Sequence, residues 1–488
     1  MRRLITFIFL FFSMGILLAQ QDTYTRIFSG MSYDEGIAAF RLPNKEIRLI
    51  GNTGSYGHGS TDIWLIALDS NGDFLWHKFY GTPEIEKATD AIMTPQGDIF
   101  IVGSTSQYYS KSYQVYFLGL DPYGQIIASE SYGGKDWDFA YGICQTSDST
   151  FAIVGETYSK GAGQSDVYLL HVNRQGDTLW TKTYGGLMED RGSSVKLMPD
   201  QGLIVTGTTK SFGNGSFDFY LLRLNPQGDT LWTNVLNHIT DAELLDVLIK
   251  PDTSIVTCGY RKDTMDTYRD FDLKEYSQEG NLVWDHYVEF HEGSDCYAST
   301  IINRPNGNIL FGGTSTYRPT ADARIIQADS EGWFKSSVFL GTNEAPDYGH
   351  KLTRDIFHGE HYFMIGTTKG YGVSMSGLFF IRVDSNLHAD TTRIVDLPTS
   401  VLTSNRSQKA SLYPNPVQDY LSIEFEKWFE GGELRVYDLI GREVIQKRLR
   451  AGQSFEIDTR ELSNGMYQIL IKSQNDLFQY RFIKQFNF

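Results

Sequence analysis

The sequence predicts an all-β protein in which one four-stranded unit is repeated along most of the chain. The first observation is a period of 52 residues, which places glycine at Gly51, Gly103, Gly155, Gly207 and Gly259. The same period places aspartate at Asp62, Asp166, Asp218, Asp270 and Asp322, with Gln114 at the missing step. The second observation is that each copy alternates short apolar runs with turn residues. Self-similarity at a fixed period is typical of a repeat architecture, in which each unit buries its apolar faces against neighbouring copies.

The third copy shows how one unit is built. Its apolar runs are Phe139 to Cys144, Phe151 to Val154, Val167 to Val172 and Leu179 to Tyr184, separated by polar or glycine-rich segments. Short β-rich runs bounded by turn residues predict four antiparallel strands, A to D. Each copy is therefore expected to form one twisted sheet.

Two further positions recur in the copies. The turn between strands C and D carries Gly72, Gly124, Gly176, Gly228, Gly280 and Gly332, while the seventh copy has Asn386 and Leu387 there. Glycine supplies the positive φ that a tight hairpin needs. Strand D carries Trp76, Trp180, Trp232 and Trp284. We interpret this tryptophan as a residue that packs one sheet on the next, and stacking on a ligand is the alternative.

The number of copies predicts a seven-bladed β-propeller over residues 21–397, because radially repeated sheets usually number about four to eight. Residues 22–30 fit the strand D register and would close the ring, although Leu387 to Asp396 compete for the same place. The copies resemble the propeller repeats of many exported bacterial proteins, through the patterns Ile-Val-Gly-x-Thr, Asp-x-Tyr-Leu-Leu and Tyr-Gly-Gly. That resemblance implies the fold far more than an activity.

The N-terminus is expected to be a secretory signal peptide over residues 1–20. Arg2 and Arg3 precede an apolar run from Leu4 to Leu18, and Ala19 follows, which is the pattern of an exported precursor and too short for a membrane span. No later run reaches the roughly 18 apolar residues of a transmembrane helix. Removal of the signal peptide would leave a mature chain beginning near Gln20 or Gln21.

Charge and cysteine content exclude several classes of partner. The formal net charge is -16, so the chain lacks the basic stripe that nucleic acids or anionic membranes require. Cys144, Cys258 and Cys296 lie at different offsets within their repeats and are expected to be unpaired. A chain of this size needs no disulfides to build a core.

The D to A and B to C loops are expected to share one face, which we take as the candidate ligand-binding surface. Its aromatic and histidine candidates are Tyr56, His58, Tyr108, Tyr109, Trp137, Phe212, Tyr317 and Tyr371. Exposed rings beside carboxylates such as Asp136, Asp138, Glu189 and Asp190 suit a polysaccharide, and a protein ligand is also open. The alternative for each ring is that it packs a loop against its sheet.

Three B to C loops spell Gly-x-Gly-x-x-Asp, at residues 57–62, 161–166 and 213–218. Oxygen-rich turns can hold Ca²⁺, but each loop offers a single carboxylate. The favoured interpretation is that the aspartate accepts backbone N–H bonds and pins the turn. We predict no other metal or cofactor.

The sequence contains no local catalytic motif, which favours binding over catalysis. A propeller hydrolase or lyase acting on polysaccharide remains the main alternative, and it requires converging carboxylates, with Asp138 and Asp190 as candidates. A structural spacer of the extracellular layer is the third hypothesis. Propeller enzymes assemble sites from several blades, so a missing motif is weak evidence.

After a Ser/Thr-rich linker over residues 398–410, alternating runs with tight turns predict a small β-sandwich at residues 411–488. Three motifs stand in order there: Tyr-Pro-Asn-Pro, Val-Tyr-Asp-Leu-Ile-Gly-Arg-Glu-Val and Leu-Ser-Asn-Gly-Met-Tyr. They resemble the type A C-terminal sorting domain of the type IX secretion system. The motif residues are Pro414, Asn415, Pro416, Tyr437, Asp438, Gly441, Asn464, Gly465 and Tyr467.

This resemblance implies a route and partners. The signal peptide would lead to the periplasm, and the C-terminal domain would direct passage through the outer membrane by the type IX machinery. A sortase-like peptidase would then remove the domain, leaving the protein secreted or attached to the cell surface. An ordinary adhesion-type sandwich is the alternative.

Overall fold

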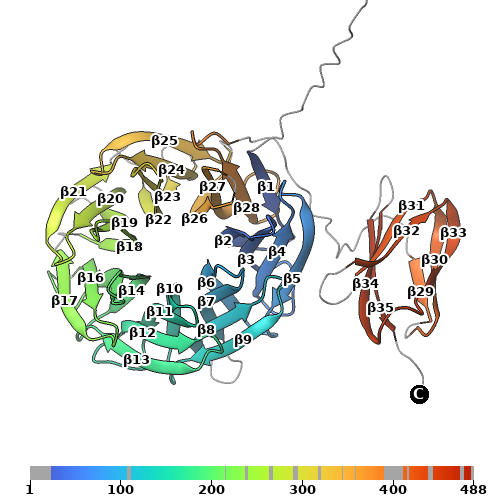
Figure 1. Ribbon diagram of the computed structural model, residues 1–488, viewed down its shortest axis with the longest axis horizontal. Helices are drawn as coiled ribbons and strands as arrows, with labels where there is room; N and C mark the ends of the chain where they lie inside the picture. Colours follow the sequence, from blue (N-terminus) through green and yellow to red (C-terminus); the bar gives the residue numbers. More distant parts are fainter. Residues whose placement is uncertain are drawn as a thin grey trace, which may run out of the picture.

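The computed structural model describes residues 23–106, 112–214, 216–236, 240–262, 268–288, 295–316, 320–342, 345–357, 359–389, 410–414, 417–437, 443–472 and 477–484. Every helix-or-strand element in these ranges is a strand, so the all-β prediction is confirmed. The strands between Tyr24 and Val383 form seven four-stranded antiparallel sheets arranged in a ring, with strand A of each sheet innermost (Figure 1). These sheets resemble propeller blades.

Six sheets each use four consecutive strands. The first three are β2 (Asp34–Arg41), β3 (Ile47–Thr53), β4 (Asp62–Leu68) and β5 (Phe74–Tyr80); β6 (Glu86–Met93), β7 (Ile99–Ser106), β8 (Tyr113–Leu120) and β9 (Ile126–Tyr132); and β10 (Asp138–Ser147), β11 (Thr150–Thr157), β12 (Asp166–Asn173) and β13 (Thr178–Tyr184). The next three are β14 (Asp190–Leu197), β15 (Leu203–Thr209), β16 (Asp218–Leu224) and β17 (Thr230–Leu236); β18 (Ala242–Ile249), β19 (Ile255–Lys262), β20 (Arg269–Tyr276) and β21 (Leu282–Val288); and β22 (Cys296–Asn303), β23 (Ile309–Ser315), β24 (Asp322–Ala328) and β25 (Phe334–Leu340).

The remaining sheet joins the two ends of the ring. It consists of β26 (Asp347–Asp355), β27 (His361–Thr368), β28 (Gly377–Val383) and the N-terminal strand β1 (Tyr24–Phe28), which pairs with β28 from Tyr24↔Arg382 to Phe28↔Leu378. Of the two segments expected to compete for this place, the N-terminal one therefore closes the ring. Leu387 and Ala389 follow β28, and residues 390–396 lie outside the described residues.

The periodic glycines of strand B have a steric cause. Each inner strand A carries a register shift opposite this glycine, as between Ala140 and Gly142 in β10. A Cβ atom at Gly155 would lie 1.9 Å from the carbonyl oxygen of Phe139, and one at Gly207 would lie 1.9 Å from that of Arg191. A bulge therefore recurs in each sheet and brings the two backbones close together. Glycine repeats every 52 residues because a side chain would not fit there.

The C to D turn glycines adopt the expected positive φ, from 71° at Gly124 to 91° at Gly176. In the seventh copy Leu387 occupies this position with a φ of 64°. A leucine in the left-handed region is strained, because its Cβ crowds the following carbonyl. The turn geometry is therefore kept even where glycine is lost.

Strand D packs each sheet on the next. A Cβ atom at the turn glycine Gly228 would meet the Trp180 ring at 2.8 Å, and one at Gly280 would meet the Trp232 ring at 3.0 Å. The Tyr184 hydroxyl donates to the Gly228 carbonyl at 2.6 Å. These contacts confirm inter-sheet packing for the strand D tryptophans. In β1, Arg26 Nε donates to the Gly72 carbonyl at 2.7 Å, so β1 makes the same link to the next sheet.

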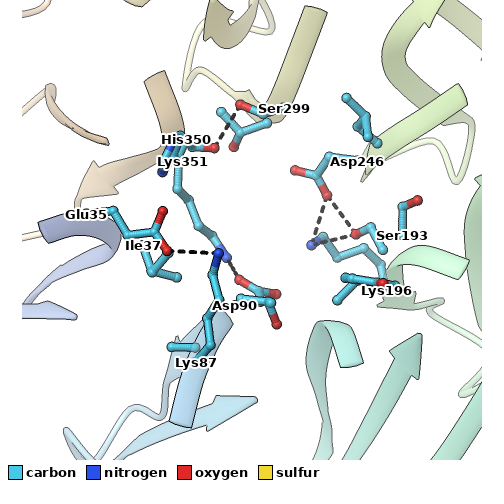
Figure 2. Close-up of a pocket in the computed structure, with 16 residues that line it drawn as sticks. Glu35, Ile37, Lys87, Asp90, Ser193, Lys196, Asp246, Ser299, His350 and Lys351 are labelled. Atoms are coloured by element: carbon cyan, nitrogen blue, oxygen red, sulfur yellow. Dashed lines mark hydrogen bonds and ion pairs between the residues drawn. The ribbon is translucent and has the colours of Figure 1, made fainter. Parts of the chain in front are cut away.

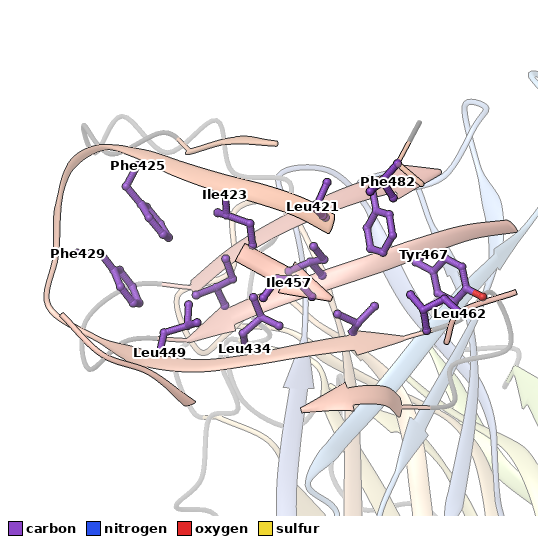
Figure 3. Close-up of a cluster of buried hydrophobic side chains, with 14 residues drawn as sticks. Leu421, Ile423, Phe425, Phe429, Leu434, Leu449, Ile457, Leu462, Tyr467 and Phe482 are labelled. Carbon is purple, nitrogen blue, oxygen red and sulfur yellow. The ribbon is translucent and has the colours of Figure 1, made fainter. Parts of the chain in front are cut away.

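The C-terminal region forms two small sheets. One contains β29 (Ala410–Tyr413), β30 (Tyr420–Phe429) and β33 (Gly452–Asp458); the other contains β31 (Gly432–Tyr437), β32 (Glu443–Leu449), β34 (Gly465–Lys472) and β35 (Leu477–Lys484). Figure 3 shows their shared core, in which Phe425 stacks on Phe429 with ring centroids 4.6 Å apart. Tyr467 stacks on Phe482 and donates to the Ser463 carbonyl at 2.8 Å. A self-contained core supports a separate folding unit.

Several expectations concern residues that the structure leaves out. The signal peptide (1–20) and the linker residues 398–409 lie outside the described residues, so these boundaries stay predictions. The same holds for Asn415, Pro416, Asp438 and Gly441 of the sorting motifs. Cys144, Cys258 and Cys296 are buried free thiols, as expected. Within the described ranges, no helix is long and apolar enough to cross a membrane.

Candidate functional site

A cavity of about 260 Å³ lies at the centre of the ring. It is lined by side chains from the innermost strand of every sheet, namely Glu35, Lys87, Tyr141, Lys196, Asp246, Ser299 and Lys351 among others (Figure 2). Inner strands converge there because propeller sheets are arranged radially. The cavity is polar, whereas the space between neighbouring sheets is filled by apolar side chains.

The cavity's charges are arranged as ion pairs between different sheets. Lys351 of β26 contacts Asp90 of β6, and Lys196 of β14 lies 3.3 Å from Asp246 of β18 (Figure 2). Both carboxylates also accept backbone hydrogen bonds, Asp90 from Ile143 N and Asp246 from Ile301 N, each at 3.1 Å. These contacts link sheets across the cavity and occupy the carboxylate oxygens.

The pKa shifts follow from this pairing. Burial alone raises the pKa of Asp246, but the ammonium groups of Lys196 and Lys351 outweigh it, so the net shift is downward. Burial lowers the pKa of Lys196, but Asp246 and Asp90 raise it to about 12. Both side chains of this pair are therefore held in their charged forms at neutral pH.

A second charged group stands beside this one. Lys87 Nζ lies 3.2 Å from Glu35 Oε1, and Asn52 donates to the same oxygen at 2.8 Å. Burial raises the pKa of Glu35, but Lys87 and His350 outweigh burial and lower it. Burial also lowers the pKa of His350, whose Nδ1 lies 2.9 Å from the Gly36 carbonyl. The cavity thus balances each of these carboxylates with a lysine.

The two carboxylates expected to converge in an enzyme hold loops instead. Asp138 accepts from Gly134 N at 2.7 Å, from Ser159 Oγ at 2.8 Å and from Thr157 Oγ1. Asp190 makes the equivalent bonds to Gly186 N, Ser211 Oγ and Thr209 Oγ1. Both side chains are fully buried at the first residue of their own inner strand, so neither faces a substrate.

The Gly-x-Gly-x-x-Asp loops show the turn-pinning role that the sequence favoured over Ca²⁺. Asp62 Oδ2 accepts from His58 N at 2.9 Å and Gly59 N at 3.0 Å, and Asp166 Oδ2 accepts from Ala162 N and Gly163 N at 3.0 Å. Asp218 accepts from Asn214 N at 3.1 Å. Among the described residues, no group of three or more His, Cys, Asp or Glu side chains is placed to hold a metal ion.

The candidate rings divide into packed and exposed ones. Tyr56 packs between Trp64 and Phe79 and donates to the Ser29 carbonyl at 2.9 Å. Tyr371 packs on the core beside β28, and burial raises its pKa to about 12. His58 is exposed. Tyr108, Tyr109 and Tyr317 lie outside the described residues.

Trp137 and Phe212 belong to an exposed apolar sector on the loops of two adjacent sheets. Trp137 is 51% exposed and contacts Tyr158 with ring centroids 6.2 Å apart. Leu187 and Met188 follow on the next D to A loop, which reaches the loop of Phe212 through the bond from Met188 N to Ser211 Oγ at 2.9 Å. We call Trp137, Tyr158, Leu187, Met188 and Phe212 the apolar sector. Each is at least 40% exposed.

Sequence reasoning missed three members of this sector. Tyr158, Leu187 and Met188 had no periodic signal, because loop residues differ from copy to copy. The signal that could have found them is large apolar side chains in loops already assigned to one face. The central cavity's lysines were also missed, since Lys196 and Lys351 read as ordinary polar residues of an inner strand.

The ring of sheets and the small two-sheet domain define an all-β protein with propeller-like blades and a C-terminal accessory domain. Residues 411–485 match the family model "Secretion system C-terminal sorting domain". The C-terminal region is therefore a sorting domain of the type IX secretion system, as the motifs indicated. Such a domain implies export, followed by secretion or attachment to the cell surface.

The proteins similar to this chain cover different shares of it. The thiol protease/hemagglutinin PrtT of Porphyromonas gingivalis is 23% identical over 159 residues, which cover 30% of this chain and 17% of that protein. The β-propeller domain of the Trilobed protease from Pyrococcus furiosus has 11% identity and a TM-score of 0.43, over 72% of this chain and 93% of that one. The WD40 domain of Neurospora crassa Pan2 has 12% identity and a TM-score of 0.43, over 73% and 91%.

Proposed function

We propose that the protein is an exported, non-enzymatic recognition protein that binds a polysaccharide on the face carrying the D to A and B to C loops. The observation that carries this proposal is the apolar sector, which exposes three aromatic rings on adjacent loops. Solvent-exposed apolar side chains gathered in one place commonly mark a binding surface. Aromatic faces stack on the C–H surfaces of sugar rings, and exposed carboxylates such as Asp136 accept hydrogen bonds from hydroxyl groups.

A protein ligand is the second candidate. Leu187 is 78% exposed, and Met188 lies beside it on the same loop. Aliphatic and thioether side chains suit the core of a protein interface better than they suit sugar hydroxyls. The two candidates make different demands on the sector, because a sugar needs the rings and a protein also uses the aliphatic loop.

Catalysis is disfavoured by how the carboxylates are used. Hydrolysis of a glycosidic bond usually requires two carboxyl groups with separated pKa values that face one cavity. Asp138 and Asp190 accept loop hydrogen bonds, and Asp90 and Asp246 are paired with lysines. The spacer hypothesis is disfavoured by the apolar sector, because a passive spacer has no use for exposed rings.

The export steps complete the proposal. Residues 1–20 would be removed as a signal peptide, and the sorting domain would be recognised by the type IX machinery and cut off by a sortase-like peptidase. The recognition protein would then be secreted or held on the outer cell surface. The exported location agrees with an acidic chain that avoids nucleic acid and anionic membranes.

A glycan and polysaccharide array probed with residues 21–488, the chain without its signal peptide, tests this function. We expect saturable binding to a subset of polysaccharides, with and without Ca²⁺, since the aspartate loops act as turns. Shortening of the arrayed polysaccharide would overturn the non-enzymatic claim. Absence of glycan binding, with capture of a protein that depends on Leu187 and Met188, would replace the polysaccharide by a protein ligand.

A further inference from the structure

The interface where the ring closes buries an unusual group of charges. Arg41 ends β2, Asp355 ends β26 and Arg382 lies on β28, where it pairs with Tyr24 of β1. All four residues are at least 95% buried. Arg41 Nε donates to both oxygens of Asp355 at 2.8 and 2.9 Å, and Arg382 Nε donates to one of them at 3.2 Å. Two guanidinium groups therefore share one carboxylate.

Comparable cations in other sheets each contact a carboxylate of their own. Arg223 in β16 is equivalent to Arg382 in β28, because Arg223 pairs with Trp232 of strand D as Arg382 pairs with Tyr24 of β1. Arg223 contacts Asp200. Arg304 lies 2.5 Å from Glu360, and Lys250 lies 2.8 Å from Glu275. In these three pairs each cation contacts a different carboxylate, whereas Arg41 and Arg382 both contact Asp355.

Donors at this interface also lack acceptors. In the part of the chain that the structure describes, Arg41 Nη2 and the Tyr24 hydroxyl are buried with no hydrogen-bond partner. Arginine stays charged at every physiological pH, and a buried N–H donor without an acceptor is costly. Arg41 Nη1 donates to the Lys45 carbonyl at 2.8 Å, so Nη2 is the nitrogen of Arg41 that lacks an acceptor.

Tyr24 keeps its proton available for donation. Burial raises the pKa of its hydroxyl to about 12, although Arg382, Arg41 and Arg26 lower it. The nearby guanidinium groups thus create a positive environment around a neutral O–H donor. Such an environment favours an anion over a water molecule, because water offers no charge to a buried cation.

We propose that a small monovalent anion, for which chloride is the probe, binds at the closing interface and accepts hydrogen bonds from Arg41 Nη2 and the Tyr24 hydroxyl. The anion supplies the acceptor that Arg41 Nη2 and the Tyr24 hydroxyl lack. It also joins the N-terminal strand, which carries Tyr24, to the first and last sheets. Its binding stabilises the closed ring.

Thermal unfolding of residues 21–488 in sodium chloride, compared with sodium gluconate at equal ionic strength, tests this site. We expect chloride to raise the unfolding midpoint of the wild type by about 1–3 °C at saturation. The Arg41→Met and Tyr24→Phe variants should lose this difference. Arg223→Gln is the matched control, because it removes a cation that has its own carboxylate, and it should keep the chloride effect.

Crystals soaked in bromide locate the ion directly. An anomalous peak within hydrogen-bond distance of Arg41 Nη2 and the Tyr24 hydroxyl is the expected result. A water molecule at that position with no bromide peak would overturn the proposal. An equal chloride effect in the wild type and in Arg41→Met would overturn it as well, because the stabilisation would then come from another place.

Discussion

Acidic residues at the starts of the inner strands illustrate what a single residue type does in a repeat. From the sequence alone, Asp138 and Asp190 are candidate catalytic groups. The structure gives each of them at least three hydrogen bonds, which tie a D to A loop to strand B and to the loop that follows it. Such a role could be suspected from the recurrence of an acidic residue at this position, since catalytic groups are not repeated in every blade.

At the same scale, the paired charges of the cavity could not be predicted. Lys196 and Asp246 are 50 residues apart and come from adjacent sheets, so their contact depends on how two inner strands approach. The sequence pattern fixes which residues face the ring centre, through strand alternation. It does not fix which charges meet, because long side chains reach across sheets.

The pair Lys196 and Asp246 makes stability depend on pH at both ends. The pKa of Lys196 is raised from 10.5 to about 12, so its contribution is complete below about pH 10.5 and is lost as the pH rises toward 12. The pKa of Asp246 is lowered from 3.8, so its contribution is present above about pH 4 and is lost as the pH falls.

Replacing the lysine tests this linkage. We expect Lys196→Met to raise the pKa of Asp246, because burial is then no longer outweighed by the nearest ammonium group. The variant should have a lower unfolding midpoint than the wild type at neutral pH. The difference between the two midpoints should become smaller as the pH falls from 5 to 3. Unfolding midpoints across this range measure it, with exposed Lys135→Met as the control. The same difference in unfolding midpoint at all pH values would contradict the ion-pair account.

At the scale of strands and sheets, the recurring residues predicted the structure, whereas the loop residues did not. The strand B glycines, the C to D turn glycines and the strand D tryptophans each have a backbone or packing cause that repeats, so their period revealed four strands per sheet. The closing strand was left open because two segments fitted one register. Pairing of β1 with β28 depends on long-range contacts that no local pattern contains.

Deletion of β1 tests the role of this strand. Removal of residues 21–30 leaves β28 as an unpaired edge and removes Arg26 and its bond to Gly72. We expect a lower unfolding midpoint and faster amide hydrogen exchange in β28 and β27, while β11 and β12 on the far side of the ring keep their protection. Unchanged exchange in β28 would show that another segment closes the ring.

At the scale of the whole molecule, the sorting domain and the proposed binding surface belong to different parts of the chain. The C-terminal sorting domain has its own core of buried apolar residues, and the ring carries the cavity and the apolar sector. The sorting motifs were readable from sequence because they are contiguous. The apolar sector was only partly readable, because it is assembled from loops of two sheets and carries no motif.

Removing the sorting domain tests this division. We expect a chain that lacks residues 411–488 to accumulate in the periplasm with its ring folded, while the full chain reaches the cell surface or the medium. Cell fractionation with an antibody to the ring measures the distribution. The full-length Trp137→Ala variant is the control, and it should be exported normally. Export of the truncated chain at the normal level would contradict the sorting role.

The most direct test of the central claim compares two exposed tryptophans. Trp137 lies in the apolar sector and is 51% exposed, whereas Trp333 is 59% exposed, immediately precedes strand D of another sheet (β25) and contacts His286. Calorimetric titration of the mature chain with the polysaccharide fragment selected on the array should show at least a tenfold loss of affinity for Trp137→Ala, about 1.4 kcal/mol, and little change for Trp333→Ala. Equal affinity of both variants and the wild type would place the ligand elsewhere and contradict the account.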